Sequence, residues 1–265
     1  MRPPENAEIY APEFPTGMEW LNVAFLRMNT LMGRGAVLVE FWDFARVNSL
    51  RTLPYLKAWH ERYADAGLRV IGVHSPGYSF GRDRYLVARA VERLEVPYAV
   101  LLDPAFEVWR LYGNKGWPGR YLFDRTGKLR LIHYGEGEYL DSELAIQECL
   151  GEERAPLEPL RPEDVPGVLL QPQTADINLP RDRARLELVR DWSDGEDWIE
   201  AADAGAAARF SYTAGGAFAV LSGAEIEPGL YEVEDVVEAD SPGLRLHGVQ
   251  FTPIPPAPSE SPSGA

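Results

Sequence analysis

The sequence predicts an α/β domain, with a central mixed sheet flanked by helices, followed by a small antiparallel β-sandwich. Two observations predict this order. Through residues 1–150, strand-length apolar runs alternate with longer helical patterns, whereas residues 181–253 contain short strand-like runs, several of them separated by glycine-containing turns. Between them, residues 151–180 contain six prolines and little periodicity, which is typical of a linker or an extended strap.

Charge divides the chain at the same place. Residues 1–150 carry 19 acidic and 18 basic side chains, and residues 151–265 carry 22 acidic and 8 basic ones, within a net charge of −15. This difference suggests two units with different surfaces. The acidic surplus argues against nucleic acid or an anionic membrane as a partner. The last segment, 254–265, is rich in Pro and Ser and is predicted to be disordered.

The elements of the first domain follow from its periodicity. Strands are expected at 36–42, 68–74, 98–102, 120–123 and 128–133. Helices are expected at 49–65, 82–95, 104–112 and 140–150. A right-handed crossover makes the first two strands parallel. The last two strands are joined by Asp124-Arg125-Thr126-Gly127, a turn sequence that favours an antiparallel hairpin.

The second domain is expected to be built only from strands. Its strand-like runs lie at 184–190, 197–202, 208–213, 217–222, 229–237 and 244–252. At the other end of the chain, residues 1–8 lack the apolar core of a signal peptide, and the longest apolar runs are strand-length. The sequence therefore predicts no membrane insertion and a cytoplasmic location.

Several segments of the first domain resemble one family. They are Phe41-Trp42, the run from Asn48 to Tyr55, Val70 to His74, Tyr112 to Pro118, and Gly135 to Tyr139. Together, residues 10–139 resemble the thioredoxin-like domain of the TlpA/redoxin type, most of all that of the DipZ-type cytochrome c biogenesis proteins. Those proteins join it to a carbohydrate-binding-like β-domain. The resemblance implies a thioredoxin fold and thiol-disulfide oxidoreductase activity, in relatives that are membrane-anchored or exported.

The residues of the family's Cys-x-x-Cys site are different in this chain. Aligned on the resemblance, the two cysteines fall on Arg46 and Ser49. Thiol-disulfide exchange needs a thiolate nucleophile and a second, resolving thiol, and neither of these residues supplies one. The single cysteine, Cys149, lies in a helical apolar pattern and is expected to be a small buried hydrophobe. We therefore expect no catalytic residue, no cofactor and no redox activity.

The remaining residues of this region form a candidate groove. Its expected members are Glu40, Trp42, Arg46, Asn48, Ser49, Trp117, Pro118 and Arg120. From the resemblance, Glu40 matches a buried acid and Pro118 a cis-proline that shapes the substrate groove. Two alternatives stand for Arg46: it faces solvent on its loop, or it forms an anion pocket with Arg120 at the start of the following helix.

Three functions are compatible with this sequence. The first is a redox-inactive module that binds a protein or peptide partner through the candidate groove. The second is the thiol-disulfide oxidoreductase activity of the family, against which the missing thiols argue. The third is sugar binding by the β-domain through Trp192, Trp198, Tyr212 and Tyr231, aromatic residues that are equally typical of a core.

The histidines do not change this choice. His60, His74, His133 and His247 show no metal-ligand spacing with one another or with carboxylates, so no metal site is expected. His74 ends a predicted strand, at the edge of an α/β sheet where sites often lie, but a histidine at a strand end is commonly structural.

Overall fold

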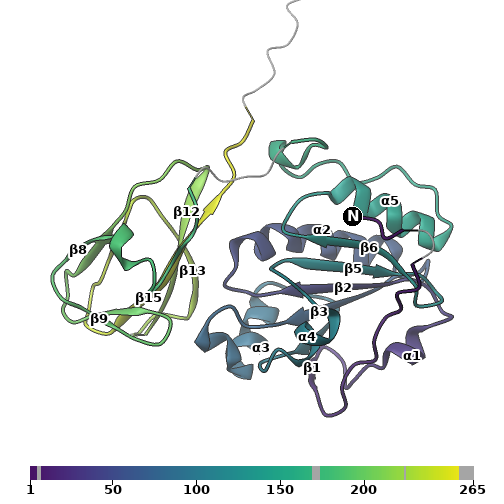
Figure 1. Ribbon diagram of the computed structural model, residues 1–265, viewed down its shortest axis with the longest axis horizontal. Helices are drawn as coiled ribbons and strands as arrows, with labels where there is room; N and C mark the ends of the chain where they lie inside the picture. Colours follow the sequence, from purple (N-terminus) through teal and green to yellow (C-terminus); the bar gives the residue numbers. More distant parts are fainter. Residues whose placement is uncertain (5–6, 169–173, 224, 257–265) are drawn as a thin grey trace, which may run out of the picture.

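The computed structural model describes residues 1–4, 7–168, 174–223 and 225–256, which form two domains lying side by side (Figure 1). Part of the predicted disordered tail, residues 257–265, lies outside the described residues. Residues 254–256 follow the last strand with exposed side chains.

A six-stranded mixed sheet forms the centre of the first domain. Its order is β1-β4-β3-β2-β5-β6. The strands are β1 (Glu19–Leu21), β2 (Val37–Trp42), β3 (Arg69–His74), β4 (Ala99–Leu102), β5 (Gly119–Phe123) and β6 (Leu129–Tyr134). The predicted parallel pair, β2 with β3, and the predicted hairpin of β5 with β6 are both confirmed. Strand β1 was not expected, because three residues are too few to show a period.

Helices cover both faces of this sheet. They are α1 (Met28–Leu31), α2 (Val47–Tyr63), α3 (Arg84–Arg93), α4 (Glu107–Tyr112) and α5 (Tyr139–Leu150). The four predicted helices are confirmed as α2 to α5: α2 lies two residues earlier than expected, α5 begins one residue earlier, and α3 and α4 are shorter. Helix α3, expected from residue 82, begins at Arg84 because a 3-10 turn, η1 (Ser79–Arg82), precedes it and the Asp83 carboxylate accepts the Tyr85 N–H at 2.8 Å as its N-cap.

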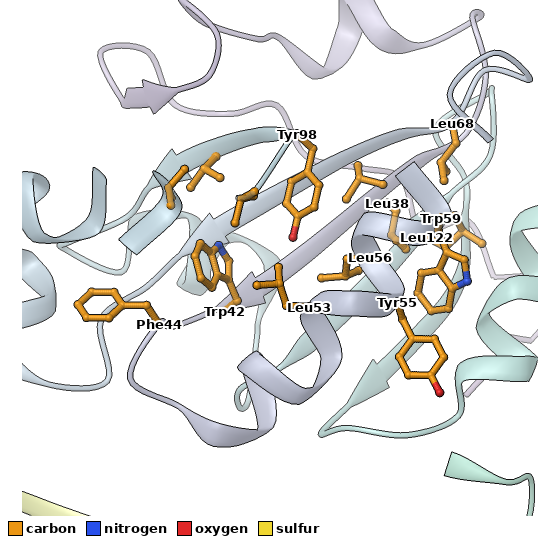
Figure 2. Packing of buried hydrophobic residues seen from close by; sticks show 14 of the residues in the cluster. Leu38, Trp42, Phe44, Leu53, Tyr55, Leu56, Trp59, Leu68, Tyr98 and Leu122 are labelled. Atoms are coloured by element: carbon orange, nitrogen blue, oxygen red, sulfur yellow. The ribbon is translucent and has the colours of Figure 1, made fainter. Parts of the chain in front are cut away.

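Successive side chains of β2 point to opposite faces of the sheet and belong to two separate hydrophobic clusters. Leu38 and Trp42 point to the face covered by α2, where they pack with Leu53 and Leu56 in one cluster (Figure 2). Val39 lies on the opposite face, in a second cluster. Side chains alternate across a strand with a period of two, so Glu40 is forced onto the same face as Leu38 and Trp42, beneath α2.

The first part of the predicted linker packs against the first domain. Tyr55 Oη, on α2, donates to Asp164 Oδ2 at 2.7 Å and accepts the Leu160 N–H at 2.8 Å. The Arg51 guanidinium contacts Glu163 Oε1 at 2.7 Å. The short η2 turn (Pro162–Asp164) is thereby held on the helix. Residues 155–164 are therefore a strap on the first domain.

The second domain is an all-antiparallel β structure, as expected. One sheet has the order β13-β12-β15-β10-β9, with β7 also paired to β15, and another has the order β14-β11-β8. The strands are β7 (Ile177–Asn178), β8 (Glu187–Val189), β9 (Trp192–Asp194), β10 (Ile199–Ala201), β11 (Ala207–Arg209), β12 (Gly216–Gly223), β13 (Gly229–Val233), β14 (Val236–Glu238) and β15 (Leu244–Thr252).

The start of the second domain differs from the expected boundary at residue 181. Ile177 pairs with Val249 of β15, and both Ile177 and Leu179 are buried in the core of the second domain. The end of the predicted linker is thus part of the sheet. Two residues of strand, next to prolines, gave no periodic signal in the sequence.

Candidate functional site

Hydrogen bonds among its own residues fix the conformation of the loop between β2 and α2. Asp43 Oδ1 accepts the Ala45 N–H at 2.7 Å, and the Asp43 N–H donates to Ser49 Oγ at 3.3 Å. Arg46 is the N-cap residue of α2, and its side chain makes no capping hydrogen bond. Ser49 is buried and its hydroxyl accepts from the loop backbone, so it acts as a structural residue here.

The second domain covers the N-terminus of α2. Gln250, on β15 and only 2 % exposed, places its side-chain amide against this loop. Its Oε1 accepts the Val47 N–H at 2.8 Å, and its Nε2 donates to the Ala45 carbonyl at 2.7 Å and to Tyr78 Oη at 3.1 Å. The first N–H groups of a helix have no partner within the helix, and they commonly bind anions or polar ligands. In this chain, one of them is satisfied by a residue of the other domain.

Arg46 lies between two aromatic rings. Its guanidinium carbon is 4.6 Å from the ring centre of Tyr78 and 4.9 Å from that of Trp117, within the range of cation–π contacts. Its Nη2 lies 3.5 Å from the carbonyl oxygen of Gly77. The side chain is half-buried. The expectation of a solvent-facing arginine is therefore wrong, because the rings remove much of this side chain from water.

Arg120 belongs to a different environment. Its Nε donates to Glu40 Oε2 at 3.0 Å and its Nη1 to Ser142 Oγ at 2.8 Å, and both members of the ion pair are buried. Glu40 and Arg120 are direct cross-strand partners of β2 and β5. The anion pocket expected from Arg46 and Arg120 is therefore wrong, because the strand register turns Arg120 toward Glu40.

The buried pair also sets the ionisation of Glu40. Burial raises the pKa of this carboxyl, and the charge and hydrogen bonds of Arg120 oppose the increase without cancelling it. The carboxylate accepts hydrogen bonds from Arg120 in the helix-side core. In this arrangement, Arg120 holds Glu40 in a buried ion pair, which is a structural role.

The other groove residues are divided between surface and core. The Trp117–Pro118 bond is cis, as the resemblance implies. Trp117 is half-buried and its Nε1 donates to the Ser75 carbonyl at 2.8 Å, whereas Pro118 is buried. Asn48 is half-buried at the start of α2. Trp42 is buried in the core and takes no part in a surface groove.

A Ser–His–Asp chain within the second domain ends at the interface with the first domain. Ser222 Oγ lies 2.7 Å from His247 Nε2, and His247 Nδ1 lies 3.3 Å from Asp197 Oδ1. Asp197 Oδ2 accepts the Ser79 N–H at 2.6 Å, and its Oδ1 accepts the Ser79 hydroxyl at 2.8 Å. Ser222 is 5 % exposed and His247 only 1 %, so the order of a catalytic triad is present without access for a substrate.

Sequence reasoning missed these interface residues. Gln250 lies 203 positions from Val47, and Asp197 lies 118 positions from Ser79. No local pattern connects such residues. The only available signal was a polar Gln250 between the apolar Val249 and Phe251.

The single thiol lies away from this loop, on α5. Cys149 is half-buried against the helix-side core. Burial raises the pKa of its thiol to about 12, so the thiolate is scarce at neutral pH. A protonated thiol is a poor nucleophile, in keeping with the expected structural role.

The aromatic residues expected to bind sugar are occupied by contacts within the chain. Trp192 is buried in the core of the second domain. Trp198 lies beneath the Arg245 guanidinium, whose carbon is 4.7 Å from its ring centre. Tyr212 packs on Phe251 at 5.1 Å between ring centres. Tyr231 is half-buried and its hydroxyl donates to a backbone carbonyl at 2.6 Å.

Among the described residues, no helix is long and apolar enough to cross a membrane. No model of a known protein family matches the chain. Protein DipZ of Mycobacterium tuberculosis is 33% identical over 173 residues, which cover 62% of this chain and 25% of that protein. The chain thus spans about a quarter of the length of this relative.

Two further comparisons each cover about half of the chain. The thiol-disulfide oxidoreductase YkuV of Bacillus subtilis is 25% identical over 124 residues, or 47% of this chain and 82% of that protein. The crystal structure of a thioredoxin-like superfamily protein covers 56% of this chain and 100% of its own, with a TM-score of 0.50 and 21% identity, which shows a shared fold. The first domain therefore has a thioredoxin fold, and a β-rich C-terminal domain follows it.

Proposed function

We propose that this protein is a redox-inactive member of its family, in which the surface around Arg46 and the N-terminus of α2 acts as a protein-interaction module. One observation carries the proposal: Gln250 of the second domain binds the Val47 N–H and the Ala45 carbonyl. Its amide satisfies one backbone donor and one backbone acceptor, as a peptide group of a bound polypeptide would. The β-domain is thus the partner of this surface within the chain, and an external protein or peptide would compete for the same groups.

The rival activity is that of YkuV, a thiol-disulfide oxidoreductase by name. A chain with one cysteine of raised pKa has no resolving thiol for such an exchange. Insulin reduction with dithiothreitol tests the two directly. We expect the protein to remain at background. The double variant Arg46→Cys/Ser49→Cys is the matched comparison, and it should form a disulfide and show weak reductase activity. Reduction of insulin by the unmodified protein at the rate of an active thioredoxin would contradict the proposal.

Hydrogen exchange tests the interaction module in the intact chain. Replacing Gln250 by Leu keeps a side chain of similar size but removes both hydrogen bonds to the loop. We expect the hydrogen of the Val47 amide to exchange with solvent at least tenfold faster. Without its hydrogen bond to Gln250, this amide becomes exposed to water at a smaller free-energy cost. Amides within α5 serve as the internal control and should not change. Unaltered exchange at Val47 contradicts the proposal.

Cytoplasmic location, expected from the sequence, belongs to this proposal as well. Fractionation of the cells that make the protein tests it, and recovery with the membranes or outside the cell contradicts it.

A further inference from the structure

Three aromatic rings gather beside Arg46 at the surface of the first domain. The ring centre of Trp109, on α4, lies 4.5 Å from that of Trp117 and 5.6 Å from that of Phe106. The ring centres of Phe106 and Trp117 are 6.3 Å apart. All three side chains are half-buried, so each remains partly open to solvent. We call Phe106, Trp109 and Trp117 the aromatic patch.

The backbone conformation of Phe106 is strained. This residue precedes α4 with a φ of 58°, in the left-handed region that a bulky side chain rarely adopts. Strain of this kind is concentrated at functional sites, where the surrounding structure maintains it. Here it keeps the Phe106 ring beside both tryptophans of the aromatic patch.

The aromatic patch also has an unused hydrogen-bond donor. Trp117 Nε1 donates to the Ser75 carbonyl at 2.8 Å, whereas the Trp109 indole N–H has no partner among the described residues. An apolar ring with one free donor suits a polypeptide that is rich in apolar rings and backbone carbonyls but poor in N–H groups. Proline-rich segments have these properties, and they bind to aromatic surfaces as preformed polyproline II helices.

A proline-rich segment of this chain follows the last strand. β15 ends at Thr252, and residues 253–258 contain two overlapping Pro-x-x-Pro repeats and no charged side chain. Ile254 is 44 % exposed, and Pro255 and Pro256 are exposed as well. These apolar side chains are therefore not packed in a core.

The segment begins close to the aromatic patch. Gln250, two residues before the end of β15, donates to the Ala45 carbonyl at 2.7 Å. The guanidinium carbon of the adjacent Arg46 lies 4.9 Å from the ring centre of Trp117. Two contacts thus lead from the end of β15 to the aromatic patch. A polyproline II helix advances about 3.1 Å per residue, so residues 254–265 span up to about 37 Å, which is ample for this separation.

We propose that residues 253–265 dock on the aromatic patch of the same chain as a proline-rich ligand. This inference rests on the proposed function, because Trp117 lies against Arg46, and it names the class of polypeptide that the surface binds. The proline rings pack on Phe106 and Trp117, and the Trp109 indole donates to a backbone carbonyl of the segment. An external protein then needs a proline-rich segment of its own to replace the tail.

The indole N–H signal of Trp109 in the isotope-labelled full-length protein tests this docking, with its assignment taken from Trp109→Phe. The triple variant Pro255→Ala/Pro256→Ala/Pro258→Ala removes the rings that favour the polyproline II helix. We expect the Trp109 signal to shift in this variant. A synthetic peptide of residues 253–265 should return it saturably to the wild-type position, and the peptide with the three alanines should bind at least tenfold more weakly.

Two further variants, each made in the triple variant, show where the peptide binds. Phe106→Asn removes one ring of the aromatic patch with a residue that tolerates the left-handed conformation, and it should weaken the peptide at least tenfold. Tyr10→Leu is the matched control and should leave the affinity unchanged. Tyr10 is exposed and pairs with Lys128 beside the β5–β6 turn, at the other end of β5 from Trp117.

The outcomes separate this inference from the proposed function. A Trp109 signal that is the same in the wild-type protein and the triple variant, or that does not respond saturably to the peptide, overturns the docking. Sedimentation of the wild-type protein as a dimer and of the triple variant as a monomer also overturns it, because the tail then occupies a second copy. Exchange of the Val47 amide in Gln250→Leu does not depend on the tail, so either proposal can fail alone.

Discussion

At the scale of single residues, Arg46 shows how a cation is accommodated at the N-terminus of a helix. A positive charge there is unfavourable by about 0.3–1 kcal/mol. The guanidinium carbon of Arg46 lies 4.6 Å from the ring centre of Tyr78 and 4.9 Å from that of Trp117. Each of these cation–π contacts contributes about 0.5–1 kcal/mol, which offsets the unfavourable charge. The buried Asp43 carboxylate adds attraction. Burial raises the pKa of Asp43, but His74, the Ala45 N–H and Arg46 together hold it below its ordinary value. The arginine is therefore accommodated at the position where the resemblance places a cysteine.

His133 leads to a prediction about pH. Burial, followed by the charge of Arg120, lowers the pKa of His133 to about 4. The unfolded chain has a value of about 6.5, so the unfolded state binds the proton more tightly. The stability contributed by neutral His133 is complete above pH 6.5 and is lost as the pH falls toward 4. Relative to His133→Gln, the wild-type protein should lose about 3 kcal/mol of unfolding free energy between pH 7 and pH 4.

Urea unfolding at pH 7, 5.5 and 4 measures that difference. The variant retains a polar side chain of similar length but does not titrate. If the free energies of unfolding of the two proteins fall in parallel with pH, His133 is not the group responsible.

At the scale of elements, the strap of residues 155–164 depends on the face of α2 that it covers. The Tyr55 hydroxyl joins two parts of it, donating to Asp164 and accepting from the Leu160 N–H. The ring also stacks on Tyr139 of α5 at 3.7 Å. One side chain thus connects the helix, the strap and the last helix of the domain.

Tyr55→Phe keeps the ring stacking but removes the hydroxyl. The Leu160 N–H loses its partner, at a cost of about 1–3 kcal/mol. Asp164 Oδ2 loses one donor but keeps its ion pair with Arg161 at 3.0 Å. We expect lower stability and faster proteolytic cleavage within 151–180, with the thioredoxin-like fragment still folded. Tyr85→Phe is the matched control, because this tyrosine is exposed, and it should change neither property. Equal cleavage rates in the two variants argue against an anchored strap.

At the scale of the whole molecule, the two domains are joined by polar contacts between distant segments. Gln250 bonds the α2 loop, Asp197 bonds Ser79, and Glu227 pairs with Arg93 at 3.0 Å. Val220 of the second domain is buried in the core cluster of the first. Such coupling predicts that the domains unfold together.

The double variant Asp197→Ala/Gln250→Leu tests this coupling. It removes the hydrogen bonds to Ser79 and to the α2 loop while leaving both cores intact. Calorimetry of the wild-type protein should show one transition, and the variant should show two, because each domain then unfolds with its own enthalpy and midpoint. A single transition in the variant means that apolar contacts, such as that of Val220, couple the domains.

The sequence by itself determined the alternation of β2 to β6 with their helices, the hairpin and the absence of thiols at positions 46 and 49. These properties depend on neighbouring residues, whose spacing of two or 3.6 expresses the face that each side chain takes. Only the tertiary structure decided that Arg120 pairs with Glu40 and that Gln250 covers the loop at Arg46. Strand register and domain docking join residues far apart in the chain, and no local period records which of them meet.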